Sequence, residues 1–458
     1  MASKWKLAIT FIAALFFAAL IWLKFAPPEL IRVGANYSAK IVCTNYFLIG
    51  REPSEVLKVD VQAPGHPLLK LMSVDVDTDR KLVRANILGL FGRGMAVYRP
   101  GTGCTVVPDG DIAAARKFTY TPDVIAAPSN DLSWPAGTKA QINDTIEKII
   151  QDDHLAGPGM RGIVVVHQGR LIAQRYGDGF NERTPLIGWS MTKTVNAVLV
   201  GMQIKQGKLM LDQDGFWPGT TPSDGREKIK LADLLAMSSG LQFNEDYGDV
   251  SDVTRMLFLA RDMAAFAHNK PLVHPPGTFW NYSTGTAVLL SHLWQEQAGD
   301  HGLTFPRDHL FAPLGMSSAF IEADASGTIV GGSYMYATAQ DWARFCQFLL
   351  QNGVWNGQQL LPENYVTMMH TVVPASRGKY AQGQLWLEGP DGDTPIGTNP
   401  DTAFHFPADT YWMQGHDGQA MALIPSKHLI VLRLGLTPHK DLYKPQAMLS
   451  KIIDALNN

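Results

Sequence analysis

Ser190 and Lys193 stand three positions apart, immediately before an apolar segment that runs from 194 to 204. At this spacing on a helix, two side chains share one face, so the amine can reach the hydroxyl. A serine hydroxyl is a poor nucleophile until a base removes its proton. A lysine is that base only when burial or positive potential destabilises its ammonium form. The apolar segment predicts a buried helix, whose amino terminus supplies both conditions and stabilises an oxyanion.

The Ser-x-x-Lys pattern alone is a weak signal, because it also occurs at Ser3 to Lys6 and at Ser376 to Lys379. The first copy lies in the leader, and the last lies in a polar, glycine-containing stretch that no apolar helix follows. Only Ser190 precedes a predicted buried helix. The tetrapeptide by itself fits equally well a serine that caps a core helix, with an unrelated lysine one turn later.

Other hydrolytic chemistries leave little trace in the sequence. The segment 188–192 lacks the second glycine of a nucleophile elbow, and no His-Glu-x-x-His sequence occurs. His416 and Asp417 are adjacent, but such a pair seldom binds a metal without further His or Cys at ligand spacing. We therefore expect a reaction that requires neither a metal nor an organic cofactor.

The segments around these residues predict an α+β fold. Isoleucines at helical spacing predict a helix over 142–150, and the residues up to Leu456 predict a final helix. Two β-hairpins are expected, with strands at 162–166, 171–176, 420–424 and 429–434. Helices from both ends of the chain should therefore cover one antiparallel sheet, while the residues between the hairpins form a mostly helical lobe.

The first residues differ from the rest of the chain. Lys4 and Lys6 precede an apolar run from Leu7 to Leu23, which is just long enough to span a bilayer, and Lys24 closes the run. A cleaved signal peptide is the alternative, but its apolar part is shorter and no small-x-small site follows the run. Cations lie on both sides of the run, so the charge bias that would keep the amino terminus in the cytoplasm is weak. We expect residues 1–28 to be a single-pass anchor or a signal segment.

Residues 29–135 contain short apolar runs broken by Gly and Pro, which predict a small β-rich module. It holds no catalytic constellation, so we expect a packing or spacer element. Export of the chain that follows the apolar run would permit one disulfide. We expect it between Cys43 and Cys104, although two free cysteines fit nearly as well. Cys346 is expected to be a buried thiol. The expected location is the bacterial inner membrane, with the catalytic domain in the periplasm.

The composition argues against a nucleic-acid partner. The formal net charge is -3, from 39 basic and 42 acidic side chains, and such a balance creates no strong field for a polyanion. Hydrophobic residues make up 46% of the 458 residues, which is enough for at least one sizeable core.

Several further segments, in order, resemble the beta-lactamase-like serine hydrolases: class C beta-lactamases, D,D-peptidases, related esterases and 6-aminohexanoate-dimer hydrolases. The matching segments are 190–193, 234–241, 275–283, 313–316, 331–333 and 415–419. Residues 239–247 look most similar to the 6-aminohexanoate-dimer hydrolase branch. The resemblance covers roughly residues 140 to 458, and it implies a beta-lactamase/transpeptidase-like domain, which we place at 136–458.

The resemblance assigns Tyr282 to the second motif of the family, where a tyrosine relays a proton to the leaving group. A phenol beside a cation such as Lys193 is expected to have a lowered pKa, which suits proton exchange. Thr284 departs from the family pattern, because many relatives carry an asparagine there that helps to hold the substrate or the lysine. This departure puts beta-lactamase activity in doubt.

The same resemblance places His416, Gly418 and Gln419 in an oxyanion and substrate-binding segment. His416 stands where a lysine begins the third motif of many relatives, so a permanent cation is replaced by a group that titrates near neutrality. Recognition of a carboxylate is then less secure. By analogy, the backbone N–H of Gln419 pairs with that of Ser190 as an oxyanion hole.

We therefore predict a serine hydrolase that acts on a small-molecule amide or ester through an acyl-enzyme on Ser190, without a cofactor. A D,D-carboxypeptidase or beta-lactamase is the main enzymatic alternative. A catalytically silent, membrane-tethered scaffold is the alternative from another class, and the intact Ser190, Lys193 and Tyr282 argue against it. Trp189, Trp280 and Trp412 are candidate walls of a substrate pocket.

Overall fold

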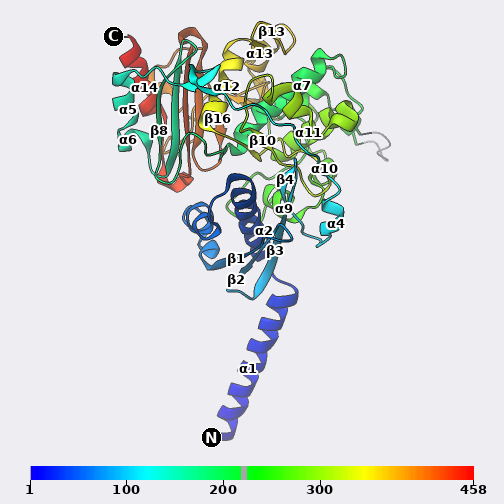
Figure 1. Ribbon diagram of the computed structural model, residues 1–458. Coiled ribbons are helices and arrows are strands. Elements are labelled where there is room, and N and C mark those ends of the chain that lie inside the picture. The colour runs from blue at the N-terminus through cyan, green and yellow to red at the C-terminus, as the bar shows by residue number, and fades with distance from the viewer. Residues whose placement is uncertain (1, 218–223, 458) are drawn as a thin grey trace. The chain divides into compact units, whose positions relative to one another are not determined.

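The computed structural model describes residues 2–217 and 224–457, and the chain forms two compact units (Figure 1). Unit 1 combines Met1–Arg99, Cys104–Phe118 and Asp246–Arg261. Unit 2 combines Pro100–Gly103, Thr119–Glu245 and Asp262–Asn458. The domain boundaries predicted after residues 28 and 135 stay predictions.

Unit 1 begins with a single long helix, α1 (Ala2–Phe25). Its 18-residue stretch Ala8–Phe25 has a mean hydropathy of 2.2, and none of this stretch is buried inside the protein. A helix of this length and composition can cross a bilayer, and a signal sequence near the amino terminus passes the same test. The predicted apolar helix is therefore present, and both interpretations of it stay open.

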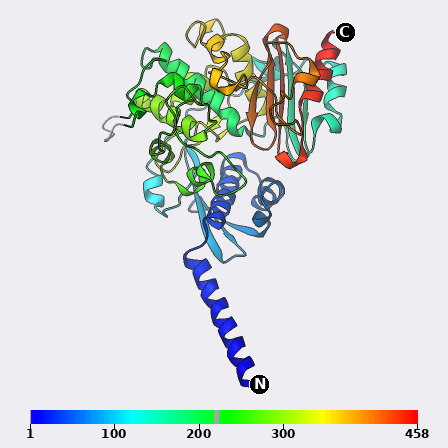
Figure 2. The same ribbon diagram turned by 180° about the vertical axis from the view of Figure 1, so that it is seen from behind.

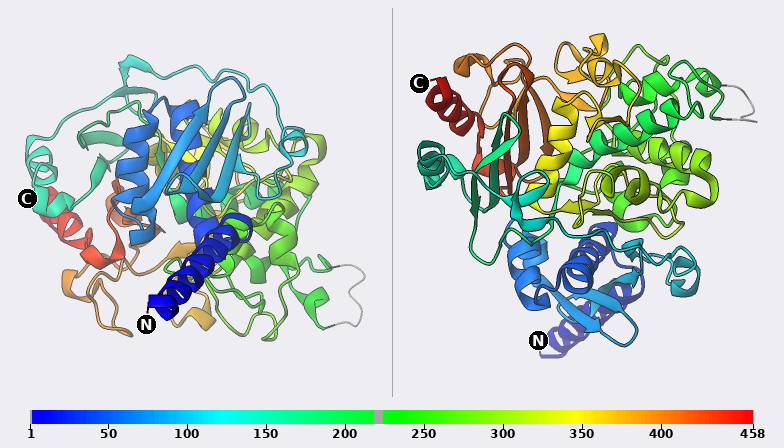
Figure 3. Two further views of the ribbon diagram at one scale, coloured as in Figure 1. Left: turned by 90° about the horizontal axis from the view of Figure 1, so that it is seen from below. Right: turned by 45° about the horizontal axis from the view of Figure 1, so that its top comes forward.

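The rest of unit 1 is a small sheet packed on a helix, α2 (Glu29–Thr44). The strands follow the chain in the order β1-β2-β3-β4, and the left panel of Figure 3 shows several of them beside α2. Gly94 of β3 has no room for a Cβ, because the α2 backbone at Ala35 and Asn36 occupies that position. The sheet and the helix therefore pack backbone to backbone. The strands are β1 (Met72–Asp77), β2 (Leu82–Ile87), β3 (Phe91–Arg99) and β4 (Gly103–Val106).

A later chain segment also belongs to unit 1. Helix α9 (Asp252–Leu259) packs against α2, where Nδ2 of Asn36 donates to the carbonyl oxygen of Phe258 at 2.8 Å and the ring of Tyr37 lies 5.5 Å from that of Phe258. Short helical turns complete the unit: η1 (Asn45–Ile49), α3 (Pro53–Val56), η2 (Leu57–Gln62), η3 (Pro67–Leu71) and α4 (Ile112–Ala115).

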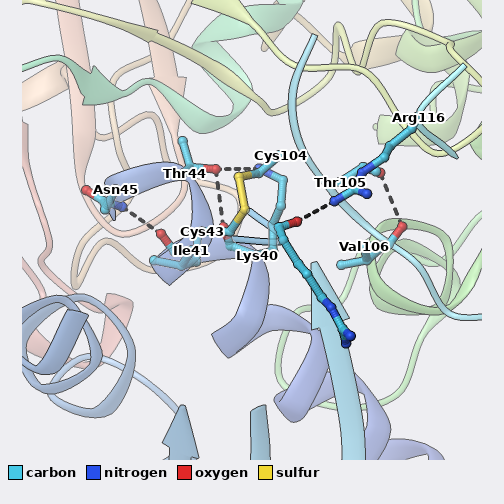
Figure 4. The surroundings of a disulfide bond; sticks show 10 residues. Lys40, Ile41, Cys43, Thr44, Asn45, Cys104, Thr105, Val106 and Arg116 are labelled. Atoms are coloured by element: carbon cyan, nitrogen blue, oxygen red, sulfur yellow. Dashed lines mark hydrogen bonds between the residues drawn. A yellow bond between two sulfur atoms is a disulfide. The ribbon is translucent and has the colours of Figure 1, made fainter. Parts of the chain in front are cut away.

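Cys43 and Cys104 form a disulfide that ties the end of α2 to β4 (Figure 4). Their Cα atoms are 6.0 Å apart, across a sequence separation of 61. The predicted pairing is therefore present, and a disulfide of this kind is typical of an oxidising compartment. Cys346 is buried and free, also as predicted, with its sulfur 3.3 Å from that of Met421.

Unit 2 is built on a seven-stranded antiparallel sheet with the order β14-β15-β16-β17-β18-β7-β8. The two predicted hairpins lie next to each other at the β8 end of the sheet, because β18 from the carboxyl end pairs with β7 from the amino end of the unit. The strands are β7 (Met160–His167), β8 (Arg170–Tyr176), β14 (Tyr380–Ala381), β15 (Leu385–Trp386), β16 (Tyr411–Gly415), β17 (Gln419–Ile424) and β18 (Leu429–Gly435).

Helices cover both faces of this sheet (Figures 1 and 2). On one face, α5 (Asp144–Ile150), α6 (Asp153–Ala156) and α14 (Gln446–Asn457) enclose a core that contains Ile163 and Val165 of β7. On the other face lies α12 (Ala339–Leu350), drawn in yellow in the right panel of Figure 3. The alternating strand residues are buried on both sides, which explains the continuous Val and Ile run in β7.

The remaining residues of unit 2 form the predicted, mostly helical lobe. Its longest helices, α7 and α11, pack on each other, and Nδ2 of Asn196 donates to the carbonyl oxygen of Ala287 at 2.7 Å. The helices are α7 (Thr192–Lys205), α8 (Leu231–Leu235), α10 (Met263–His268), α11 (Thr284–Ala298) and α13 (Tyr365–Met369).

Short strands and turns join these helices. The strands are β5 (Ser129–Ser133), β6 (Gly137–Lys139), β9 (Leu186–Ile187), β10 (Phe320–Ile321), β11 (Met335–Ala337), β12 (Val354–Trp355) and β13 (Gln358–Gln359). The helical turns are η4 (Trp189–Met191), η5 (Arg226–Lys228), η6 (Gly299–His301), η7 (Arg307–Phe311), η8 (Pro374–Ser376), η9 (Thr402–Phe404), η10 (Pro425–Lys427) and η11 (His439–Asp441).

Candidate active site

Ser190 lies in η4, a single 3₁₀ turn that leads directly into the buried helix α7. The preceding residue, Trp189, has a φ of 47°, a left-handed conformation that is uncommon for a bulky side chain. The backbone before it is fixed, because the Gly188 N–H donates to the carbonyl oxygen of Met335 at 3.0 Å. A bend held in this way fixes the direction in which the serine points.

Lys193 lies in the first turn of α7, and its side chain is only 1% exposed. Its Nζ donates to Oγ of Ser190 at 2.9 Å, to Oγ1 of Thr284 at 2.9 Å and to the carbonyl oxygen of Gly332 at 3.0 Å. The structure therefore places the serine and the lysine in contact, as their spacing predicts. All three hydrogens of an ammonium have acceptors, so the amine has one defined position.

The Ser-x-x-Lys copy at 376–379 has other partners. Oγ of Ser376 donates to the carbonyl oxygen of Val373 at 2.7 Å, and Nζ of Lys379 lies 3.8 Å from a carboxylate oxygen of Glu388. These contacts support a local structural role for both side chains. The choice of Ser190 from its sequence context agrees with this geometry.

Glu245 joins the group around the lysine, although it is not among the residues predicted for the site. Its Oε2 accepts from the backbone N–H of Thr284 at 2.7 Å, and its Oε1 accepts from the Thr284 hydroxyl. The same Oε1 lies 4.0 Å from Nζ of Lys193. The carboxylate thus sits at the amino terminus of α11, where a negative charge is favoured. The only signal in the sequence was its position inside the segment 239–247, which carries the resemblance.

Thr284 compensates for the asparagine that many relatives carry at this position. Its hydroxyl accepts from Lys193 and donates to Glu245, so it connects the amine to the carboxylate. Gly332 can approach this threonine closely only because it has no side chain, since a Cβ on Gly332 would lie 2.7 Å from Cγ2 of Thr284. The lysine is therefore held by a hydroxyl, a carboxylate and a glycine carbonyl.

Tyr282 lies two residues before the start of α11 and close to Lys193. Nζ of Lys193 is 4.8 Å from the centre of its ring, and its hydroxyl shares a hydrogen bond with the Ser190 side chain. The structure therefore brings the three predicted catalytic residues, Ser190, Lys193 and Tyr282, together.

The turn between β16 and β17 lies beside the serine. Gly415 abuts the carbonyl oxygen of Gly188, so a Cβ has no room there, and the ring of His416 lies 5.8 Å from that of Trp189. The side chain of Gln419 faces into the sheet, where Oε1 accepts from the Gly435 N–H at 2.9 Å. The oxyanion role of its backbone N–H stays a prediction.

The other predicted residues of this turn have structural partners. Nε2 of His416 lies 3.4 Å from Oδ1 of Asp417, and the carbonyl oxygen of Gly418 accepts from Arg433 at 3.0 Å. A cavity of about 250 Å³ opens beside the turn. It is lined by residues 390–392, 414–419, 437–439 and Tyr443.

The beta-lactamase family model matches residues 144–445, which is more than half of the chain and includes Ser190, Lys193 and Tyr282. The chain belongs to the beta-lactamase family. The family and the fold predicted from the sequence are therefore confirmed. Proteins with this fold are generally serine hydrolases.

Solved structures show the same fold at low sequence identity. A putative 6-aminohexanoate-dimer hydrolase from Bacillus anthracis is 19% identical, with a TM-score of 0.57 over 74% of this chain and 91% of that one. A putative beta-lactamase from Bacteroides dorei DSM 17855 is 19% identical, with a TM-score of 0.54 over 69% of this chain and 98% of that one. SurE with D-Leu is 21% identical, with a TM-score of 0.50 over 68% and 74% of the two chains. A search of curated proteins found no match.

The surroundings of Lys193 in this beta-lactamase-family site shift the amine toward its neutral form. Burial lowers the pKa of Lys193 to about 8, although the negative charge of Glu245 acts in the opposite direction. At pH 7 roughly a tenth of the molecules then carry the free amine. Burial therefore supplies the condition under which a lysine can act as a base.

The expected lowering of the Tyr282 pKa is wrong. Burial raises the pKa of its phenol, the charge of Glu245 raises it further, and only the hydrogen bond with Ser190 acts in the opposite direction. The loss of hydration outweighs the nearby cation because the phenolate would be buried beside a carboxylate. Tyr282 is therefore a protonated phenol at neutral pH. It is suited to relay a proton and not to act as a deprotonated general base.

The three tryptophans predicted to line a substrate pocket have different environments. Trp412 belongs to the sheet core, and its Nε1 donates to Asp401 at 3.0 Å, so it is not a pocket wall. Trp189 is buried against His416. Trp280 is partly exposed and belongs to an aromatic group that also contains Tyr282, Tyr380 and Trp386.

Proposed function

We propose that this protein is a serine hydrolase that cleaves an amide or ester bond through an acyl-enzyme on Ser190. One observation carries the proposal: Nζ of the buried Lys193 lies 2.9 Å from Oγ of Ser190. A neutral amine at this distance accepts the hydroxyl proton, and burial keeps a fraction of the amine neutral.

In the proposed reaction, Oγ of Ser190 bonds to the substrate carbonyl carbon while its proton passes to Nζ of Lys193. The carbonyl oxygen becomes an oxyanion, which the backbone N–H groups of Ser190 and Gln419 are proposed to stabilise. The bond to the leaving amine or alcohol then breaks, and Tyr282 transfers a proton to that group while it receives one from Lys193. Water attacks the acyl-enzyme by the reverse proton route and releases the acid.

The proposed substrate is a small amide or ester that is not recognised through a carboxylate. His416 and Thr284 stand where many relatives carry a lysine and an asparagine, so the site has neither the permanent cation nor the amide. The likeness to a protein titled a putative 6-aminohexanoate-dimer hydrolase points to linear amides of amino acids as the first class to test. We place the catalytic unit in the bacterial periplasm, anchored in the inner membrane by α1.

Labelling with a fluorophosphonate tests the nucleophile. The wild-type chain should be labelled covalently, and Ser190→Ala should not be. Absence of specific label across several fluorophosphonates would favour the silent scaffold. Turnover of a nitrophenyl ester, a linear aminohexanoate amide and nitrocefin then separates the substrate classes, and nitrocefin as the best substrate would support the beta-lactamase alternative.

A further inference from the structure

Unit 1 contains a cavity of about 500 Å³ where α1 ends. Its wall is formed by the end of α1, by the residues that follow it, by the first turns of α2 and by β3. The lining contains three cations and no acidic side chain: Lys24, Phe25, Ala26, Pro27, Arg32 and Arg93. A cavity with this lining favours an anion.

The three cations of this cavity differ from the other arginines of unit 1. Within residues 2–217 and 224–457, no ion pair or side-chain hydrogen bond joins Lys24, Arg32 or Arg93 to the protein. By contrast, Arg51 is paired with Asp60 at 2.8 Å and Arg255 with Glu29 at 2.9 Å. Carboxylates thus neutralise Arg51 and Arg255, while the positive charge around the cavity is available to a ligand.

The same end of unit 1 carries exposed leucines. Leu88 and Leu90, in the turn between β2 and β3, are 62% and 64% exposed, and the Leu88 N–H donates to the carbonyl oxygen of Leu71, which is 49% exposed. Gly92 abuts Ile31 at the start of α2, so the turn and the start of α2 lie at one end of the unit. Helix α1 also contacts β3.

The cationic cavity and the exposed leucines lie near the end of α1, where an inserted α1 would leave the bilayer. The apolar stretch of α1 ends at Phe25, next to Lys24, and an apolar helix of this length places its end among the lipid headgroups. Cations at that depth meet phosphates, and exposed leucines meet the boundary of the acyl chains. The partner is thus a lipid, because the cavity begins where the membrane-spanning stretch ends.

We infer that unit 1 binds the membrane surface. Lys24, Arg32 and Arg93 bind the phosphate of an anionic phospholipid headgroup there. Leu71, Leu88 and Leu90 enter the interface beside it. The inference rests on the proposed anchoring by α1 and is independent of the proposed hydrolysis. It gives a function to the amino-terminal module, in which the sequence shows no catalytic group.

Lipid binding by the full chain tests this inference. The chain is purified in a non-ionic detergent, its amino-terminal mass is checked, and it is titrated with phosphatidylglycerol or phosphatidylcholine while native mass spectrometry counts the bound lipids. We expect one phosphatidylglycerol to be retained at least tenfold more tightly than phosphatidylcholine. Arg32→Gln/Arg93→Gln should reduce this preference at least tenfold, because two of the three phosphate partners are lost.

A matched control is Lys58→Gln/Lys117→Gln, which removes the same net charge from exposed positions of unit 1 outside the cavity. This variant should keep the preference. Equal retention of the two lipids, equal loss in both double variants, or a mature chain that begins after Phe25 would each overturn the inference. Competition by millimolar glycerol phosphate would instead assign the cavity to a soluble phosphate. Fluorophosphonate labelling of the same samples reports on Ser190, so a failure of the proposed hydrolysis is seen separately.

Discussion

Nζ of Lys193 lies 4.0 Å from Oε1 of Glu245, and the hydroxyl of Thr284 bonds to both groups. Burial and this carboxylate change the basicity of the amine in opposite directions. Burial lowers the pKa of Lys193, and the carboxylate raises it, with the result at about 8. A site of this kind holds the lysine in place without making it permanently charged.

The first prediction concerns the dependence of activity on pH. In the proposed reaction the neutral amine of Lys193 is the base, so kcat/KM should rise with pH through an apparent pKa near 8. Below that pH, activity should fall about tenfold per pH unit, because each unit reduces the neutral fraction tenfold. Initial rates with a nitrophenyl ester from pH 6 to 9.5 measure this, and a flat profile would contradict it.

Glu245→Gln should move that profile toward lower pH. The carboxylate raises the pKa of Lys193, so its removal lowers this pKa further and leaves more free amine at pH 7. The maximal kcat should fall, because the amide can no longer accept from both the backbone N–H and the hydroxyl of Thr284. Glu363→Gln, at an exposed position of unit 2, is the control and should leave the profile unchanged. A shift to higher pH in Glu245→Gln would refute the assigned electrostatic role.

Thr284 should require its hydroxyl and not its methyl group. Thr284→Val removes the bridge between Lys193 and Glu245 and leaves a buried acceptor and donor unpaired, so kcat/KM should fall roughly 10- to 100-fold. Thr284→Ser keeps the hydroxyl and should stay within a few-fold of the wild type. Equal losses in the two variants, measured with the same ester, would show that the threonine acts only through packing.

Much of the fold was predictable because the apolar residues of its core segments follow the pattern of the helix or strand that they form. Residues of the Val and Ile run in β7 and isoleucines of α5 are buried in one core. Their sequence patterns therefore predicted correctly which residues are buried. The disulfide between Cys43 and Cys104 was one of two open alternatives. Trp412 was misjudged, since a tryptophan on a short strand has the same local pattern in a core as at a pocket wall.

The site was only partly predictable, for a physical reason. Ser190 lies in the turn η4 and Lys193 three residues later in the first turn of α7, so local spacing fixes their contact. Glu245 lies in a polar stretch and reaches the lysine only because the start of α11 packs beside α7, which no local pattern reports. The direction of the Tyr282 pKa depends on the same packing, because burial and a carboxylate outweigh the cation.

The disulfide of unit 1 should contribute to stability but not to catalysis. It closes a long loop, and the loss of such a bond typically costs about 2–4 kcal/mol. Cys43→Ala/Cys104→Ala should therefore lower the thermal midpoint of unit 1, while fluorophosphonate still labels Ser190 at low temperature. Reductant should lower the midpoint of the wild type and have no effect on the double variant. Two free thiols in the exported chain, detected by mass spectrometry, would contradict the pairing.

Gly332 should tolerate no side chain. Its carbonyl oxygen accepts from Lys193 at 3.0 Å, and a Cβ would lie 2.7 Å from Cγ2 of Thr284. Gly332→Ala must therefore move the carbonyl, the threonine or both, and each movement releases the amine from its position against Ser190. We expect kcat/KM to fall on the order of 10²-fold, because a displacement of about 1 Å at reacting groups has that effect.

Gly162→Ala is the matched control for this substitution. A Cβ on Gly162 would meet its nearest neighbour at 3.5 Å, an ordinary contact, in a strand outside the catalytic group. The control should keep its activity, and both variants are compared by rates with a nitrophenyl ester and by thermal unfolding. If Gly332→Ala retains wild-type kcat/KM while it unfolds at a lower temperature, the carbonyl serves packing and does not position Lys193. A loss of activity in a chain that still unfolds cooperatively near the wild-type temperature supports positioning of the amine by this carbonyl.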